Sequence, residues 1–126
     1  MTTKQLLIAI RNDQQTADEI INVWHRSEKG MPPEQPLHKL YFDDLETLWK
    51  TLTQRRMHLL QMLRQSGPLS IRKLAATLNR DYKNVHSDVT RLSALGLIES
   101  GKEGLYFVPW DLIDLQVQIP LALHAA

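Results

Sequence analysis

The stretch from Asp81 to Gly96, DYKNVHSDVTRLSALG, constrains the fold most strongly, because it contains a complete helix with its start and stop signals. Asp81 is a favourable N-cap, since its carboxylate can accept hydrogen bonds from the free N–H groups of a first helical turn. Gly96 stands where a left-handed residue commonly ends a helix. Val85, Val89 and Leu92 recur at helical spacing and predict one buried face.

The opposite face of this helix carries cations and hydrogen-bond donors but no carboxylate, with Asp88 at the edge of the buried side. Such a face suits the DNA major groove, where base edges offer acceptors and phosphates line the walls. A solvated amphipathic helix shows the same pattern, so the prediction depends on the flanking sequence.

The charges of the chain are unevenly distributed. The net charge is only +1, but eight Lys and Arg stand against two acids between Thr53 and Gly96, a balance of +6, which leaves −5 for the remainder. A basic block of this kind is the electrostatic signature of a site for a polyanion. The acidic remainder is suited to a different partner, such as a basic protein.

The N-terminal third predicts a strand, a helix and a linker. Residues 4–10 read as a short strand, and Thr16 with Glu19 forms a capping box that opens a helix ending at Gly30. Residues 30–36, GMPPEQP, contain three prolines and predict a linker.

Three further capped helices precede the Asp81 helix. Residues 38–42 read as extended, and Asp43 with Glu46 predicts the start of the first helix. Thr53 caps the second, and Ser70 caps a short third helix with an apolar stripe at i, i+3, i+4 and i+7. Asn79 is the expected left-handed residue of the turn that follows, because Asn tolerates that conformation.

After Gly96 the pattern changes to strand. Residues 97–99 and 105–108 predict a β-hairpin with a charged tip at Lys102. Residues 113–119 alternate apolar and polar side chains, which predicts a strand with one buried face.

The last three of these four helices, followed by the hairpin, predict a winged helix-turn-helix, in which the last helix enters the major groove and the hairpin is the wing. The predicted fold class is α+β, mainly helical, with an N-terminal strand–helix extension and a C-terminal strand. We expect an N-terminal dimerisation or partner element at 1–36, the DNA-binding domain at 37–109, and a strand with a tail at 110–126.

Candidate DNA contacts lie on the two last helices and the wing. Each has a structural alternative as a cap, a core side chain or solvated surface. The set is Ser70, Arg72, Lys73, Arg80, Tyr82, Lys83, Asn84, His86, Ser87, Thr90, Arg91 and Lys102.

The terminal apolar strands and the helix at 16–29 are not needed to complete a winged helix, so we expect them to form a dimer or partner interface. The alternative is that they fill the core of a single chain. The candidate interface residues are Leu6, Ile8, Ile10, Ile20, Trp24, Leu115, Val117 and Ile119.

The stretch SIRKLAATLNRDYKNVHSDVTRLSALGLIE resembles winged-helix proteins grouped with MarR-like regulators, and more narrowly the TumA-type antitoxins of toxin–antitoxin operons. The resemblance extends through YFDDLETLWKTLTQRR upstream and VPWDLIDLQVQIPL downstream. It implies DNA binding, autoregulation of an operon and neutralisation of a toxin protein. Because regulators that bind palindromic DNA need a dimer, we also expect a homodimer. MarR proteins have long dimerisation helices at both ends around a small-molecule pocket, which this chain lacks. A freestanding ligand-responsive regulator and a protein-binding winged helix remain the alternatives.

Nothing in the sequence indicates catalysis or a cofactor. The chain has no cysteine, which excludes disulfides and thiolate metal sites and fits a cytoplasmic protein. Its five histidines show no metal-binding spacing, and no nucleophile or phosphate-loop motif is present. The apolar run at 6–10 is too short for a signal peptide or a membrane span.

Overall fold

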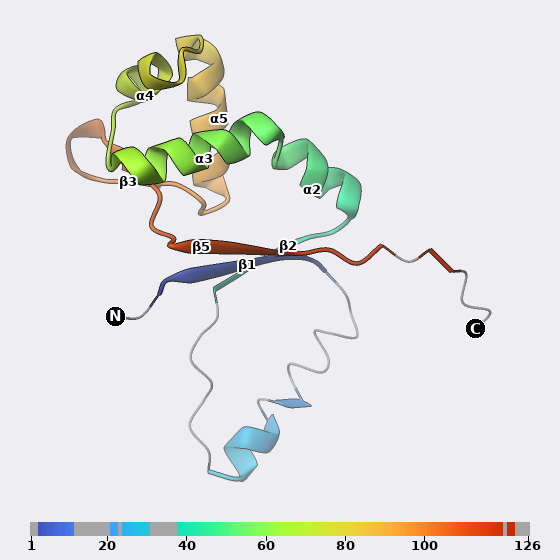
Figure 1. The fold of residues 1–126 in the computed structure, drawn as a ribbon. Coiled ribbons are helices and arrows are strands. Elements are labelled where there is room, and N and C mark those ends of the chain that lie inside the picture. The colour runs from blue at the N-terminus through green and yellow to red at the C-terminus, as the bar shows by residue number, and fades with distance from the viewer. Residues whose placement is uncertain (1–2, 12–20, 23, 31–37, 120, 123–126) are drawn as a thin grey trace. The chain divides into compact units, whose positions relative to one another are not determined.

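The computed structural model describes residues 3–11, 21–22, 24–30, 38–119 and 121–122, and its fold is α+β (Figure 1). The chain divides into two compact units. The helical unit comprises Met1–Lys4 and Trp49–Leu112, and the sheet unit comprises Gln5–Leu48 and Ile113–Ala126. This division differs from the expected boundaries at 36 and 109, because the strands on both sides of the Pro-rich segment pair with each other.

The sheet unit contains three strands in the order β2-β1-β5. β1 (Gln5–Ile10) is central and pairs in parallel with β2 (His38–Phe42), from Leu6 opposite His38 to Ile10 opposite Phe42. β1 is the central strand, and its residues Leu6 and Ile8 are buried within the chain. This burial favours the alternative of a core strand for β1, while a role of these residues in a dimer interface stays a prediction.

A helical segment lies in the sequence between β1 and β2. Residues 21–22 and 24–28 are helical, and Gly30 adopts a left-handed φ of 67° where the helix was expected to end. Trp24 is 67% exposed on this segment. The expected capping box at Thr16, the interface residue Ile20 and linker residues 31–36 lie outside the described residues.

The helical unit is built on α3 (Gln54–Ser66), α4 (Ile71–Leu78) and α5 (Tyr82–Ala94), which follow the shorter α2 (Leu45–Thr51). Thr53, Ser70 and Asp81 cap α3, α4 and α5 through their side chains, as predicted. The cap of α2 was misplaced by one residue. The Asp44 carboxylate, rather than that of Asp43, accepts from the Thr47 amide at 2.7 Å.

A residue in the left-handed conformation ends each of the helices α4 and α5. Asn79 follows α4 with φ 52° and ψ 48°, and the Arg80 amide donates to the Ala75 carbonyl at 3.0 Å. Gly96 follows α5 with φ 81°, and the Leu97 amide donates to the Leu92 carbonyl at 3.0 Å. Both ends satisfy terminal helix carbonyls in the Schellman pattern, which fixes the directions in which the chain enters and leaves α5.

The hairpin after α5 is shorter than predicted. β3 (Glu99–Ser100) pairs antiparallel with β4 (Tyr106–Phe107) across the turn η1 (Lys102–Gly104). Leu97 was expected in the first strand, but it precedes β3, and its side chain is fully buried. Leu69 forms a bridge with Tyr106 on the far side of β4, through backbone hydrogen bonds of 2.7 and 3.0 Å. The hairpin is thereby anchored to the segment between α3 and α4.

The C-terminal strand differs most from its prediction. β5 covers Leu112–Gln116 and lies at an edge of the three-stranded sheet. Its predicted buried face is not buried, since Leu115 is 36% exposed and Ile119 61% exposed, while Ile113 and Val117 are half-buried. The alternation in the sequence predicted a strand correctly but not what covers it.

Candidate nucleic-acid interface

The two faces of α5 differ as the sequence predicted. Val85, Val89 and Leu92 are fully buried. The opposite face exposes seven side chains that were predicted to contact DNA, namely Tyr82, Lys83, Asn84, His86, Ser87, Thr90 and Arg91. This face has no carboxylate along its length, because the one acid of α5 lies elsewhere.

Contacts within α5 engage some of these side chains and limit the hydrogen bonds that they can make to a ligand. The Thr90 hydroxyl donates to the His86 carbonyl at 2.8 Å, so its oxygen can offer a ligand only acceptor lone pairs. The rings of Tyr82 and His86 are tilted by 39° with centroids 6.0 Å apart. Because Tyr82 is half exposed, it does not close the helical core, which was the alternative to a DNA contact.

The start of α4 supplies a second set of candidates. The Ser70 hydroxyl accepts from the Lys73 amide at 3.1 Å, so its role as a cap is confirmed. Arg72 and Lys73 are exposed in the first turn of α4, with no carboxylate of the described residues paired to either. The Lys73 carbonyl accepts from the Thr77 hydroxyl at 2.9 Å.

Arg80 lies differently from its prediction as a DNA contact. Its Nη2 donates to Asp88 Oδ2 at 2.7 Å, and its side chain is only 17% exposed. Arg56 Nε donates to the other oxygen of Asp88 at 2.9 Å, and Arg56 Nη1 donates to the Thr51 carbonyl at 2.9 Å. Arg80 is therefore held by an ion pair within the chain, and its contact with DNA stays a prediction.

We call Arg56, Arg80 and Asp88 the Asp88 triad. It joins the end of α2, the first turn of α3, the α4–α5 turn and the middle of α5. The position of Asp88 at the edge of a buried face, in an otherwise basic segment, was the one sequence signal for this arrangement. Sequence reasoning did not identify Arg56 as its partner.

The hairpin tip is electrically neutral. Lys102 is exposed as predicted, but Glu103 stands beside it with a left-handed φ of 60°. The Gly101 amide closes the turn by donating to the Leu105 carbonyl at 2.7 Å.

The basic block divides into structural and exposed cations. Arg56 and Arg80 pair with Asp88, while Arg64 pairs with Asp111 and donates to the Val108 carbonyl. The other five cations of the block are exposed, and no described carboxylate pairs with them: Arg55, Arg72, Lys73, Lys83 and Arg91.

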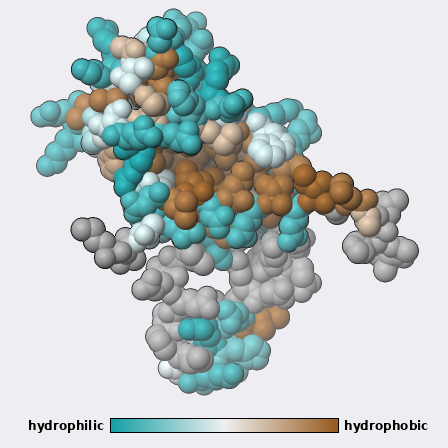
Figure 2. Space-filling view, in the orientation of Figure 1, coloured by the Kyte–Doolittle hydropathy of each residue, from teal (hydrophilic) through white to brown (hydrophobic). Residues whose placement is uncertain are grey.

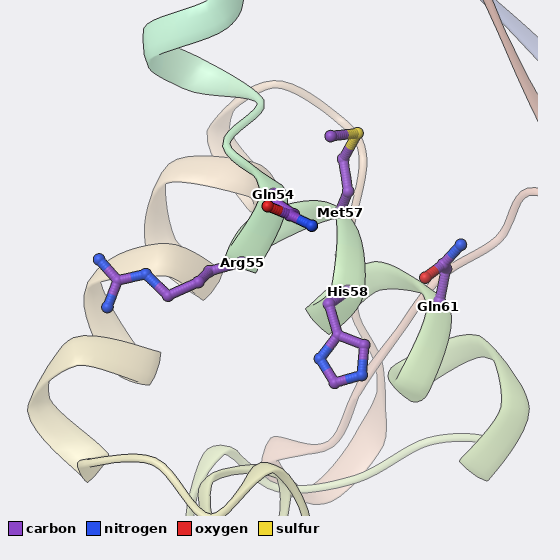
Figure 3. Close-up of a pocket in the computed structure, with 5 residues that line it drawn as sticks. All are labelled: Gln54, Arg55, Met57, His58 and Gln61. Atoms are coloured by element: carbon purple, nitrogen blue, oxygen red, sulfur yellow. The ribbon is translucent and has the colours of Figure 1, made fainter.

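An open pocket of about 510 Å³ lies on α3 and is lined by Gln54, Arg55, Met57, His58 and Gln61. Figure 3 shows that all five side chains come from this one helix and spread apart rather than converge on a common point. An open pocket lined by a single helix does not match the enclosed sites that bind small molecules.

No cluster of side chains within the described ranges could hold a metal ion. In the same part of the chain, no helix has the length and hydrophobicity needed to cross a membrane.

The HVO_A0114 family, which is uncharacterised, matches residues 51–115. This match covers just over half of the chain and nearly all of the helical unit. The chain therefore belongs to the HVO_A0114 family. No curated protein and no solved structure matches it.

Proposed function

We propose that the protein is a sequence-specific DNA-binding transcriptional repressor whose residues 53–108 form a winged helix-turn-helix. The order of the parts supports this, since α3, a short strand segment at Leu69, α4, α5 and an antiparallel hairpin follow one another. In this arrangement α4 braces α5, α5 enters the major groove, and the hairpin is the wing.

The observation that carries the proposal is the exposed face of α5, which presents Lys83, Asn84, Ser87 and Arg91 with no carboxylate among them. Amides and guanidinium groups can read base edges, and both cations can contact phosphates. Arg72 and Lys73 add two cations at the start of α4. Ser70 and Lys102 remain secondary candidates.

The test is the double variant Lys83→Ala with Arg91→Ala. Both side chains are exposed, so the variant should keep the wild-type circular dichroism and melting temperature. Binding to the DNA upstream of its own gene, measured by fluorescence anisotropy, should weaken. If both residues contact phosphates, the slope of log K against log salt should become shallower by about 1.8, at about 0.9 per contact. A lost base contact should instead cost about 1–3 kcal/mol on the cognate sequence and relax specificity at one position.

A matched control removes the same charge elsewhere. Arg11 and Lys29 are exposed and lie outside the helical unit, so Arg11→Ala with Lys29→Ala should leave the affinity near that of the wild type. If both double variants lose affinity equally, net charge and not the α5 face determines binding. If the Lys83/Arg91 variant stays folded and binds as tightly as the wild type, the proposal is wrong.

We further propose, from the resemblance to TumA-type antitoxins, that the repressor acts as a homodimer and neutralises a toxin protein. The charge balance of −5 outside residues 53–96 suits a basic partner. Co-expression with the product of the adjacent gene tests this. Co-purification and relief of growth arrest support an antitoxin, whereas a chain that purifies alone and still represses its promoter supports a freestanding regulator. Stable capture of the partner by a chain that shows no DNA binding would support the protein-interaction alternative.

A further inference from the structure

The outer edge of β5 is an apolar feature of the sheet unit that the proposed DNA contacts do not explain. No other strand of the described residues pairs with this edge, because the strand order places β1 on the other side of β5. Figure 2 shows hydrophobic side chains in a row over β5 and the segment that follows it. In this segment Leu115 and Ile119 are 36% and 61% exposed, and Ile113 and Val117 are half-buried.

An apolar edge strand offers unpaired backbone groups beside hydrophobic side chains, which is a template for pairing with another strand. We propose that the segment 113–117, beginning within β5, pairs antiparallel with the same segment of a second copy of this chain. The six strands of the two copies would then form one continuous sheet. This proposal specifies the surface of the homodimer in the proposed function, and it does not depend on the DNA contacts of α5.

The chemistry of the segment favours a second copy over a basic protein. From Leu112 to Ile119 the only charged side chain is Asp114, so this edge has little to attract a cationic partner. The segment is instead self-complementary in hydrophobicity, with one apolar face and one face of Asp114, Gln116 and Gln118. A two-fold axis brings the same patch together twice, so a patch that matches itself is the requirement for such a dimer.

The side chains also select the register. Residues directly opposite each other in antiparallel strands point to the same face, so apolar residues meet only where odd-numbered positions oppose odd-numbered positions. An axis at Asp114 would place two carboxylates opposite each other, which is unfavourable. An axis at Gln116 would place Pro120 of one copy opposite Leu112 of the other, and proline cannot donate to the ladder.

An axis at Leu115 has neither defect. It places Leu115 opposite the partner's Leu115 and Ile113 opposite the partner's Val117. It also places Asp114 opposite the partner's Gln116, which can donate to it. The two groups already interact within one chain, where Gln116 Nε2 donates to Asp114 Oδ2 at 3.2 Å. We therefore assign the two-fold axis to Leu115.

Cysteine cross-linking tests the register directly, because the natural chain has no cysteine. Residues opposite each other in an antiparallel pair have Cα atoms about 4.5–5.5 Å apart, which lies within the range that a disulfide spans. Leu115→Cys should give a covalent dimer under mild oxidation. Gln118→Cys should not, since the axis at Leu115 places the two copies of residue 118 six positions apart along the strand. A dimer formed preferentially by Gln118→Cys would overturn the register.

The dimer itself is tested by sedimentation of the full chain without DNA. The wild type should sediment as a dimer, and Leu115→Asp, which adds like charges across the axis, should raise the dissociation constant at least about tenfold. Leu121→Asp adds the same charge at a side chain that is 92% exposed and outside the paired segment, so it should sediment as the wild type does.

A wild type that is monomeric, or a folded Leu115→Asp variant that is as dimeric as the wild type, would overturn the proposal. Neither result would affect the DNA proposal, whose test is the loss of affinity on mutation of Lys83 and Arg91. Conversely, a dimer cross-linked at residue 115 that binds no DNA would leave this surface established and the DNA proposal refuted.

Discussion

Replacing Asp88 with asparagine should destabilise the helical unit more than any conservative change on the exposed face of α5. The substitution keeps the size of the side chain but removes the negative charge that now accepts from Arg56 Nε at 2.9 Å and from Arg80 Nη2 at 2.7 Å. The two guanidinium groups would remain close together, 20% and 17% exposed, with no anion between them.

The size of the effect follows from burial. Removing one partner of a fully buried ion pair costs about 3–5 kcal/mol, chiefly because the remaining charge is left uncompensated. The side chains of the triad are 13–20% exposed, so water screens part of the uncompensated charge and lowers this cost. We expect a loss of about 3 kcal/mol in the free energy of unfolding, which in a domain of this size lowers the melting temperature by more than about 10 °C.

Urea denaturation followed by circular dichroism in the far ultraviolet measures this loss, because most of the described helix lies in the helical unit. Glu99→Gln is the matched control, since it removes one negative charge from an exposed side chain of the same unit and should change stability by less than about 0.5 kcal/mol. A triple variant with Arg56→Met, Asp88→Leu and Arg80→Met should recover much of the loss, because well-packed apolar residues often replace a buried ion network at little cost.

The reasoning is refuted if Asp88→Asn unfolds within about 0.5 kcal/mol of the wild type. A triple variant as unstable as the single one would show that geometry, and not uncompensated charge, causes the loss.

Two further substitution pairs test the helix phase and the hairpin tip. Val89→Asp should unfold the helical unit, because it buries an unpaired carboxylate. Thr90→Asp should keep the circular dichroism spectrum of the wild type and weaken DNA binding, because the new carboxylate repels phosphates. The reverse behaviour of the two variants would show that the buried and exposed faces of α5 are wrongly assigned. Glu103→Asn should raise the free energy of unfolding by about 0.5–1 kcal/mol in urea denaturation, because Asn tolerates the left-handed φ of 60° that Glu103 adopts. If Glu103→Gln is as stable as Glu103→Asn, that explanation is wrong. Both changes at residue 103 remove an acid from the tip and should tighten DNA binding at low salt to the same extent.

The helical unit was predictable from the sequence because its signals are local. The caps Thr53, Ser70 and Asp81, the left-handed Asn79 and the buried face of α5 each depend on residues within about one or two helical turns. The Asp44 cap shows the limit of such reasoning. Two adjacent aspartates offer the same carboxylate group, and the sequence pattern did not show that α2 begins at Leu45, directly after Asp44.

The sheet was not predictable in the same way, because pairing joins residues that are far apart in the sequence. The patterns of 4–10, 38–42 and 113–119 each predicted extended chain, but none identified its neighbours. Only the order β2-β1-β5 determines that Leu6 and Ile8 are enclosed while Leu115 stays at an edge. Apolar residues that look alike in the sequence are therefore buried in β1 and exposed in β5.

The Asp88 triad explains why a count of the cations in the basic block does not tell which of them are exposed. A count of charges treats every arginine alike, yet Arg56 and Arg80 pair with a carboxylate that lies 32 and 8 residues away. Because the triad contains two cations and one anion, it withdraws only one net positive charge from the exposed surface. It also withdraws the one acid of α5 from the side where phosphates would lie. A helix face that binds DNA needs a positive field and no nearby carboxylate that repels phosphates. In the DNA complex that we propose, the ion pairs of Asp88 would supply the second condition and lower the net positive charge by only one.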